Sequence, residues 1–233
     1  MKNARMKFVK DRDSNPLVPG HYYLFNWIKP FMKKNSKILD IGCWSGPLEE
    51  LFSQEKCHVT GIDIEDEPIE YTRKKFPNFT FLKASIIDPL PLRKKTFDIA
   101  AYFMVIEHIP KGTELDSLIQ INRVLKSSGQ LFINTMSYNV LSNLLDPMFF
   151  LGHRHYTRKE LTRLLKKSGF SIKEIKYNGG LFTTLHIFLL YFFKHVLKKQ
   201  EPRNKILDKL MELDYKDRGF VEIDIRAEKI KDK

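Results

Sequence analysis

Short apolar runs alternate with helical segments from residue 37 onward, and this alternation restricts the possible folds more than any other feature of the chain. Each run has the length of a strand, and each segment between runs carries the apolar periodicity of a helix. Strands joined by helices form right-handed parallel units. The predicted strands are 37–41, 58–63, 79–82, 97–103, 130–134, 171–177 and 220–226. The sequence therefore predicts an α/β fold, a mostly parallel sheet with helices on both faces.

The composition excludes several classes of protein. A chain of 233 residues with 42% hydrophobic residues can build one sizeable α/β domain, but not two. Only Cys43 and Cys57 are present, which excludes a disulfide scaffold and a four-cysteine zinc site. The net charge of +12 favours an anionic partner without identifying one. The start is polar and basic, with no signal peptide and no apolar stretch of about 18 residues, so we expect a cytoplasmic protein.

The segment 37–48 carries the most informative chemistry. An apolar strand ends at Asp40, passes through a turn containing Gly42, and leads into a helix with Pro47 in its first turn. Glycine at this turn lets a ligand approach the backbone, and a helix start favours a negatively charged group. Asp63 ends the next strand, 23 residues after Asp40, where an acid can accept hydrogen bonds from ribose hydroxyls. We therefore expect a nucleoside with a charged tail.

The stretch from about 37 to 180 resembles the class I S-adenosylmethionine-dependent methyltransferases, in particular the group that includes the quinone and sterol enzymes. The segments that carry this resemblance are 40–46, Asp63, 84–92, 97–109, 123–129 and 156–170. It implies a Rossmann-like seven-stranded sheet with an antiparallel last strand, and S-adenosylmethionine as cofactor. The cofactor-binding residues that it implies are Asp40, Gly42, Gly46, Asp63, Ser85, Ile86 and Phe103.

The sequence departs from the family pattern at three places, and two of these bear on the cofactor. Trp44 replaces the middle glycine of the first motif, and its ring either points away from the ligand or packs near the methionine end. Ser85 replaces an acid that usually contacts the adenine amine. Methyl transfer needs a general base only if the acceptor must lose a proton, so no catalytic residue is assigned. The candidates for such a base are His108, His153, His155 and Tyr156. Two histidines without a third nearby ligand predict no metal site.

The predicted organisation has two parts. Residues 1–36 form an N-terminal arm and a lid helix, with Tyr22 and Tyr23 as the residues closing over the site. Residues 37–233 form the methyltransferase domain, with a hydrophobic helical insert at about 181–218. A helix that is apolar all round favours burial on every side. The insert therefore either covers the acceptor pocket or rests in a lipid interface, with residues 181–205 contacting an anionic membrane.

The predicted function is methyl transfer from S-adenosylmethionine to a small-molecule or lipid-linked acceptor. Three alternatives stay open: a nucleotide-binding oxidoreductase, an RNA or protein methyltransferase, and a non-catalytic binding module that keeps the fold. Trp44 motivates the last of these. Nucleic acid is disfavoured as a substrate because the fourth strand is followed by Tyr102–Val105 rather than by an Asn-Pro-Pro-aromatic motif.

Overall fold

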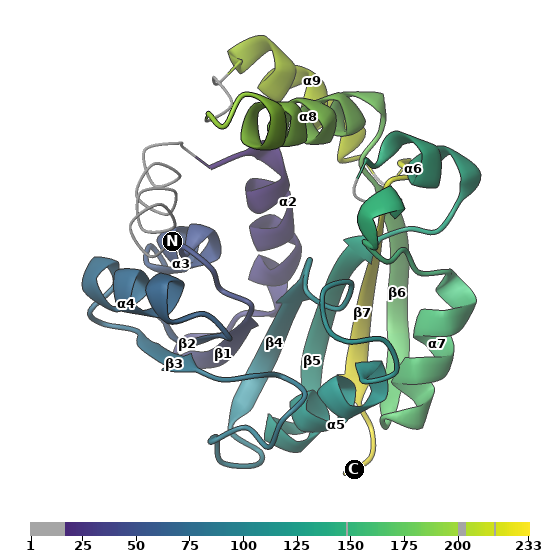
Figure 1. The fold of residues 1–233 in the computed structure, drawn as a ribbon. Coiled ribbons are helices and arrows are strands. Elements are labelled where there is room, and N and C mark those ends of the chain that lie inside the picture. Colours follow the sequence, from purple (N-terminus) through teal and green to yellow (C-terminus); the bar gives the residue numbers. More distant parts are fainter. Residues whose placement is uncertain (1–16, 148, 200–203, 217) are drawn as a thin grey trace.

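The computed structural model describes residues 17–147, 149–199, 204–216 and 218–233, and the predicted arm over residues 1–16 lies outside these ranges. A seven-stranded sheet of order β3-β2-β1-β4-β5-β7-β6 runs through the molecule (Figure 1). The strands are β1 Ser36–Ile41, β2 Cys57–Asp63, β3 Thr80–Lys83, β4 Phe97–Phe103, β5 Leu125–Met136, β6 Phe170–Asn178 and β7 Glu222–Lys229. Only β7 runs antiparallel to its neighbours, β5 and β6. The predicted fold class is confirmed.

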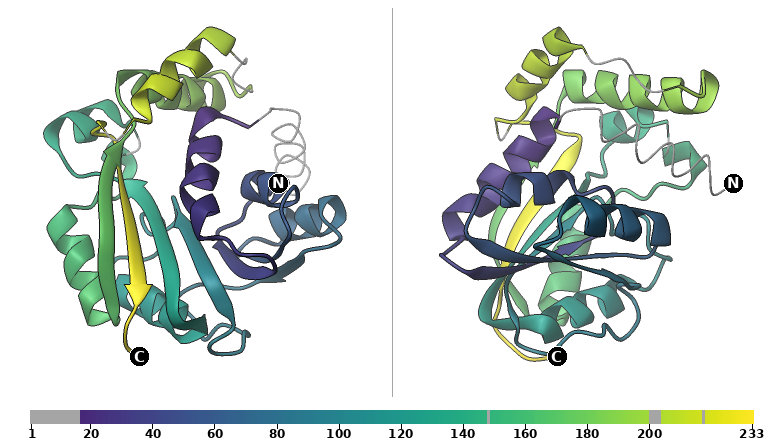
Figure 2. Two further views of the ribbon diagram at one scale, coloured as in Figure 1. Left: turned by 180° about the vertical axis from the view of Figure 1, so that it is seen from behind. Right: turned by 90° about the vertical axis from the view of Figure 1, so that its left-hand side faces the viewer.

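Helices cover both faces of the sheet, as Figure 2 shows. The helices are α2 Pro19–Ile28, α3 Pro47–Phe52, α4 Asp66–Lys75, α5 Glu114–Val124, α6 Val140–Leu145, α7 Arg158–Lys167, α8 Leu181–Tyr191 and α9 Lys205–Asp214, with shorter turns at η1 Lys29–Phe31, η2 Phe149–Leu151 and η3 Phe192–Val196. Helices α2, α3 and α4 lie on one face, and α5 and α7 lie on the other. The hydrophobic core therefore has two layers, one on each side of the sheet.

The strand sequences explain the two layers. Successive side chains point to opposite faces, so Ile38 packs with the α2 and α3 side of the core while Leu39 packs with the α5 and α7 side. Both faces are covered, so β1 is buried at every position except Lys37. Strand β5 begins earlier than predicted, because Leu125 pairs with Phe97 directly after α5 ends.

Local signals in the sequence fix several helix ends. Pro47 occupies the first turn of α3. Backbone N–H groups in a first turn have no acceptor within the helix, so the N–H that proline lacks costs no hydrogen bond there. Thr157 and Glu160 form a reciprocal capping box at the start of α7. Gly169 adopts a left-handed φ of 85° after that helix, which stops it and turns the chain into β6.

The insert between β6 and β7 forms α8, η3 and α9 at the carboxyl end of the parallel strands (Figure 1). The expectation that its apolar helix is buried on every side is wrong. The side chains of one face are 40–64% exposed, namely Leu181, Leu185, Phe188 and Phe192. In the described part of the chain, no helix combines the length and hydropathy needed to cross a bilayer.

Candidate functional site

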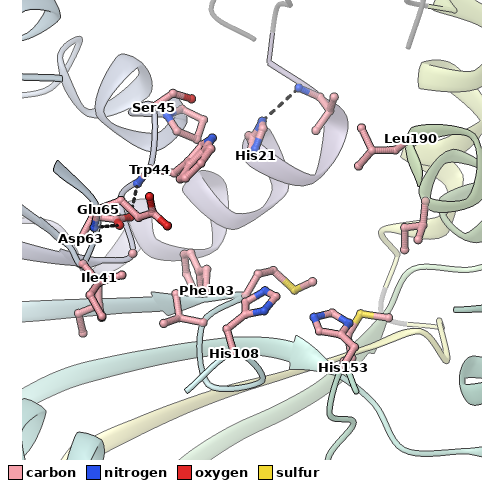
Figure 3. A pocket seen from close by; sticks show the side chains of 18 of the residues that line it. His21, Ile41, Trp44, Ser45, Asp63, Glu65, Phe103, His108, His153 and Leu190 are labelled. Carbon is pink, nitrogen blue, oxygen red and sulfur yellow. Dashed lines mark hydrogen bonds between the residues drawn. The ribbon is translucent and has the colours of Figure 1, made fainter. Parts of the chain in front are cut away.

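A cavity of about 870 Å³ opens at the carboxyl ends of β1, β2 and β4. Ligands of open α/β sheets bind at this edge, at the point where the strand order reverses between β1 and β4. Helix α2 contributes His21 to the lining, and α8 contributes Leu190 from the far side (Figure 3) together with Ile187. The volume lies near the upper end of the range of about 300–1,000 Å³ for ligand pockets.

The turn after β1 has a left-handed backbone at Gly42, Trp44 and Gly46, with φ values of 75°, 45° and 79°. A Cβ on Gly42 would lie 2.3 Å from Val105 Cγ2, and a Cβ on Gly46 would lie 2.5 Å from Phe76 Cε2. Glycine is required at both positions by the backbone angle and by this close packing. Val105 therefore occupies the space that a Cβ on Gly42 would need, and Gly42 also lines the cavity.

Trp44 forms part of the cavity wall. Its backbone N–H donates to Asp63 Oδ2 at 3.1 Å, which ties the β1 turn to the end of β2. Its indole lines the cavity, and Nε1 is buried without a hydrogen-bond partner among the described residues. The cavity keeps its volume of about 870 Å³ with this ring in its wall. The indole therefore lines the cavity without closing it.

Asp63 lies at the end of β2, is 9% exposed and also lines the cavity. One carboxylate oxygen accepts the Trp44 N–H, and the other accepts the Glu65 N–H at 3.0 Å. Burial raises the pKa of Asp63, and these backbone N–H groups oppose the shift. A carboxylate offers about four acceptor positions, so Asp63 retains capacity for further donors.

Asp40 supports the turn from below. It is 4% exposed and packs beside Glu49 of α3, which is fully buried. Burial raises the pKa of Asp40 to about 7 and the pKa of Glu49 well above its usual value. The pair therefore holds at least one proton at neutral pH. Asp40 and Gly46 are not among the described residues that line the cavity, whereas the other five predicted cofactor residues line it: Gly42, Asp63, Ser85, Ile86 and Phe103.

The structure narrows the four candidates for a general base to two. His155 contacts Asn143 Oδ1 at 2.8 Å and Asp146 Oδ2 at 2.9 Å, so both ring nitrogens are engaged. The Tyr156 hydroxyl donates to the Ile106 carbonyl at 2.9 Å. Neither side chain is among those lining the cavity. The remaining candidates, His108 and His153, both line it, and Figure 3 shows their rings near one another at its lower edge.

Acidic side chains that the sequence analysis missed surround these two histidines. Asp146 Oδ2 lies 3.1 Å from His153 Nδ1. Glu107 is 2% exposed, and its Oε2 accepts the Thr135 hydroxyl at 2.8 Å. Burial raises the pKa of Glu107 to about 7. No spacing in the sequence points to these contacts, because Glu107 and Asp146 lie 39 residues apart on separate loops.

Residues on α2 and α8 cover the cavity, although not those predicted for the lid. Tyr22 is 48% exposed, and the Tyr23 hydroxyl donates to Asp224 Oδ2 at 2.9 Å. His21 lines the cavity instead. It is held by the Val18 N–H, which donates to its Nδ1 at 3.2 Å.

Comparison with known proteins adds the family. Methyltransferase domains match residues 19–175, more than half of the chain. The chain belongs to this methyltransferase family. Ubiquinone biosynthesis O-methyltransferases of Vibrio campbellii and Vibrio parahaemolyticus are 30% identical to it over 112 residues, which cover 46% of this chain and 47% of each relative. The methyltransferase thus spans about half the length of the curated relatives that it matches.

Solved structures share the fold of this methyltransferase. An S-adenosylmethionine-dependent methyltransferase from Methanosarcina mazei aligns with a TM-score of 0.63 and 19% identity, over 88% of this chain and 97% of its own. The cyclase SpnF aligns with a TM-score of 0.66 and 16% identity, over 88% of this chain and 80% of its own. At such identities the likeness shows the fold alone, since one fold hosts several chemistries.

S-adenosylmethionine is the cofactor that the sequence resemblance implies for this methyltransferase. The cavity fits this cofactor in two respects. Asp63 has acceptor capacity for a ribose diol, and apolar side chains such as Ile62 and Ile86 can cover an adenine. The unpartnered Trp44 Nε1 adds a hydrogen-bond donor in the same wall.

Proposed function

We propose that this methyltransferase transfers the methyl group of S-adenosylmethionine to a small-molecule or lipid-linked acceptor that binds beyond Phe103 and Met104. The observation that carries the proposal is the continuity of one cavity from Asp63 to His153. At about 870 Å³ it has room for the cofactor and a second molecule. In this proposal the Asp63 end holds the cofactor, and the His153 end holds the acceptor.

Within the cofactor end, each predicted residue has a proposed role. Asp63 accepts hydrogen bonds from the ribose hydroxyls, and Ser85 and Ile86 flank the adenine. Asp40 and Gly46 act indirectly, by holding the turn after β1. The residues proposed to contact the cofactor are Gly42, Asp63, Ser85, Ile86 and Phe103.

The cofactor supplies an electrophilic methyl group on a sulfonium ion. The protein aligns the two reactants and excludes water from the cavity. Phe103 and Met104 lie at the tip of β4, in the cavity wall, where they can align the two reactants. Ile187 and Leu190 of α8 shield the cavity from water. The positive charge disappears during methyl transfer, so an apolar enclosure favours the reaction.

The outer face of α8 supports a lipid-linked acceptor. Leu181, Leu185, Phe188 and Phe192 follow helical spacing and are exposed, while Ile187 of the same helix lines the cavity. A helix with one apolar face toward a cavity and another toward solvent is suited to a lipid interface. Membrane contact of this face would bring the cavity close to lipid-borne acceptors.

Charge also favours an anionic lipid surface as the occupant of this face. The exposed Lys198 and Lys199 lie six and seven positions after Phe192, the last residue of the apolar stripe, and the chain carries a net charge of +12. Basic residues near an anionic leaflet contribute roughly 1 kcal/mol each to binding. We therefore propose peripheral contact between the 181–205 region and anionic lipids.

Methyl transfer can be tested with methyl-labelled S-adenosylmethionine and three fractions: total lipid, aqueous metabolites and RNA. We expect label in the lipid or metabolite fraction with the wild-type protein, and a strong loss of that label with Asp63→Ala. Label that enters only RNA or protein would overturn the proposed acceptor class. Binding of the cofactor without transfer to any fraction would favour a binding module.

Membrane contact can be tested by flotation with phosphatidylglycerol vesicles at low salt. Phe188→Glu should abolish flotation, since a charge on the exposed stripe opposes insertion, while cofactor affinity stays unchanged. Ile230→Glu is the matched control, because Ile230 is also an exposed apolar residue, at 57%, and lies near the C-terminus. Equal flotation of both variants would refute the α8 surface. Dimerisation through the stripe, detected by light scattering without flotation, would assign this face to a second copy instead.

A further inference from the structure

Three side chains that can ligate a metal meet at the acceptor end of the cavity. Glu107 and His108 follow β4, and His153 precedes α7. One ligand atom from each lies within 4.8 Å of the other two. His108 and His153 line the cavity, with ring centroids 4.7 Å apart (Figure 3). The fold thus supplies a third potential ligand that the sequence analysis did not find beside the two histidines.

Two atoms of this cluster are buried acceptors without a partner in the described part of the chain. Glu107 is 2% exposed, and its Oε1 has no hydrogen bond, although Oε2 is bonded to Thr135. The His153 side chain is 6% exposed, and its Nε2 also has no partner. Burial of an acceptor without a hydrogen bond is unfavourable, so two such acceptors in one cluster call for a bound positive group or donor.

The contacts of His153 leave Nε2 available as a ligand. An ionised carboxylate only accepts hydrogen bonds, so the Nδ1–H of His153 donates to Asp146 at 3.1 Å. With Nδ1 as the donor, Nε2 carries the lone pair, and one ligand atom of His153 lies within 4.8 Å of one from Glu107. Histidines that bind metals are held in this way, with the second nitrogen donating to a carboxylate. Asp146 is itself fixed by His155 at 2.9 Å.

We propose that Glu107, His108 and His153 form a binding site for a divalent transition-metal ion at the acceptor end of the cavity. Two imidazoles and one carboxylate form a ligand set that suits Zn²⁺, Fe²⁺, Co²⁺ or Mn²⁺ better than Mg²⁺. The same set explains why Glu107 keeps one oxygen unsatisfied in a buried position. The alternative trio of Asp146, His153 and His155 is less suitable, because its ligand atoms already bond to one another.

The role of the metal rests on the proposed function, whereas its binding does not. Three protein ligands leave coordination positions open toward the cavity, where an oxygen of the acceptor can bind. A bound hydroxyl loses its proton more readily on a cation, which produces the oxygen nucleophile for methyl transfer. The proton leaves to solvent, and the chain then needs no separate general base.

The binding claim is tested on full-length protein treated with a chelator, by calorimetric titration with Zn²⁺ and by visible absorption with Co²⁺. We expect one ion per chain and the d–d bands of a site with nitrogen and oxygen ligands. Glu107→Gln and His153→Gln should weaken binding about tenfold or more, and Asp146→Asn should weaken it less. His58→Gln is the matched control, because His58 is exposed at the opposite end of β2.

His108→Gln provides a check on folding, since its exposed side chain is the ligand least needed for packing. Retained S-adenosylmethionine binding identifies the variants that have folded. The proposal is refuted if the wild type binds no ion, or if folded ligand variants bind it as tightly as His58→Gln. If the metal-free protein methylates, and His153→Gln abolishes the fall in rate at low pH, His153 acts as a general base. The proposed function would then stand without the metal.

Discussion

The two ends of the cavity are built in different ways. At the cofactor end, the backbone positions the lining residues. Gly42 and Trp44 have left-handed backbone angles, and Asp63 accepts hydrogen bonds from two backbone N–H groups. At the acceptor end, side chains from separate loops meet: His153 contacts Asp146, and its ligand atom lies within 4.8 Å of one from Glu107.

This difference separates what is shared within the fold from what is particular to this chain. A cofactor end made from one turn and two adjacent strand ends needs only a short stretch of sequence. An acceptor end assembled from loops and the α8 insert can change without disturbing that turn. We therefore expect substitutions at one end to leave ligand binding at the other end intact.

The largest expected effect comes from Gly42→Ala. The new Cβ would meet Val105 at 2.3 Å, on a backbone with φ of 75°, so we expect a loss of about 2–4 kcal/mol in unfolding free energy. Gly112→Ala is the control, since Gly112 has φ of 95° and open space around it, and should lose only about 1–2 kcal/mol. Urea denaturation measures both. Equal losses would show that packing against Val105 does not constrain the turn.

Asp63→Ala tests the independence of the two ends. The variant loses the hydrogen bonds that the Asp63 carboxylate accepts from the ribose, which are worth about 1.5–3 kcal/mol. We therefore expect calorimetry to show a dissociation constant for S-adenosylmethionine that is about 10- to 100-fold higher. Zn²⁺ binding should not change. Asp146→Asn should give the reverse pattern, weaker Zn²⁺ binding with normal cofactor affinity. Asp66→Asn, an exposed acid paired with Lys83, serves as the control. If either variant weakens both ligands, the comparison between the two ends fails.

The smallest expected effect concerns the buried acids below the cofactor turn. The pKa of Asp40 is about 7 in the folded protein and 3.8 ordinarily, so the folded state binds more protons between these values. Stability contributed by this pair is therefore present at low pH and lost as pH rises through about 4 to 7. Glu49→Gln should reduce this loss by about 1 kcal/mol.

Thermal melting across this pH window measures the difference. Glu50→Gln is the control, because Glu50 pairs with Lys75 near the surface at 3.0 Å. Part of the pH dependence of stability should remain in Glu49→Gln, because burial raises the pKa of Glu222 to about 7 as well. If stability depends on pH in Glu49→Gln as it does in the wild type, Asp40 and Glu49 do not share a proton in the folded state.

The fold was largely predictable because its signals are local. Strand β4 was predicted with its observed limits, and the capping box of α7 joins residues only three positions apart, Thr157 and Glu160. Of the cofactor residues, Asp63 and Ser85 line the cavity, but Asp40 does not. Sequence alone could not separate these cases, because burial beside Glu49 depends on how α3 packs against β1. The lid residue was also missed, since Tyr23 bonds to Asp224, about 200 residues away.

The sequence by itself determined the alternation of strands and helices, the glycine-containing turn after β1 and the acid at the end of β2. These follow from hydrophobic periodicity and backbone sterics, which act over a few residues. Only the tertiary structure decided that Glu107, His108 and His153 meet, and that one face of α8 lines the cavity while another stays exposed. Such contacts join segments distant in the chain, and no local pattern encodes them, because the packing of the whole sheet sets their distances.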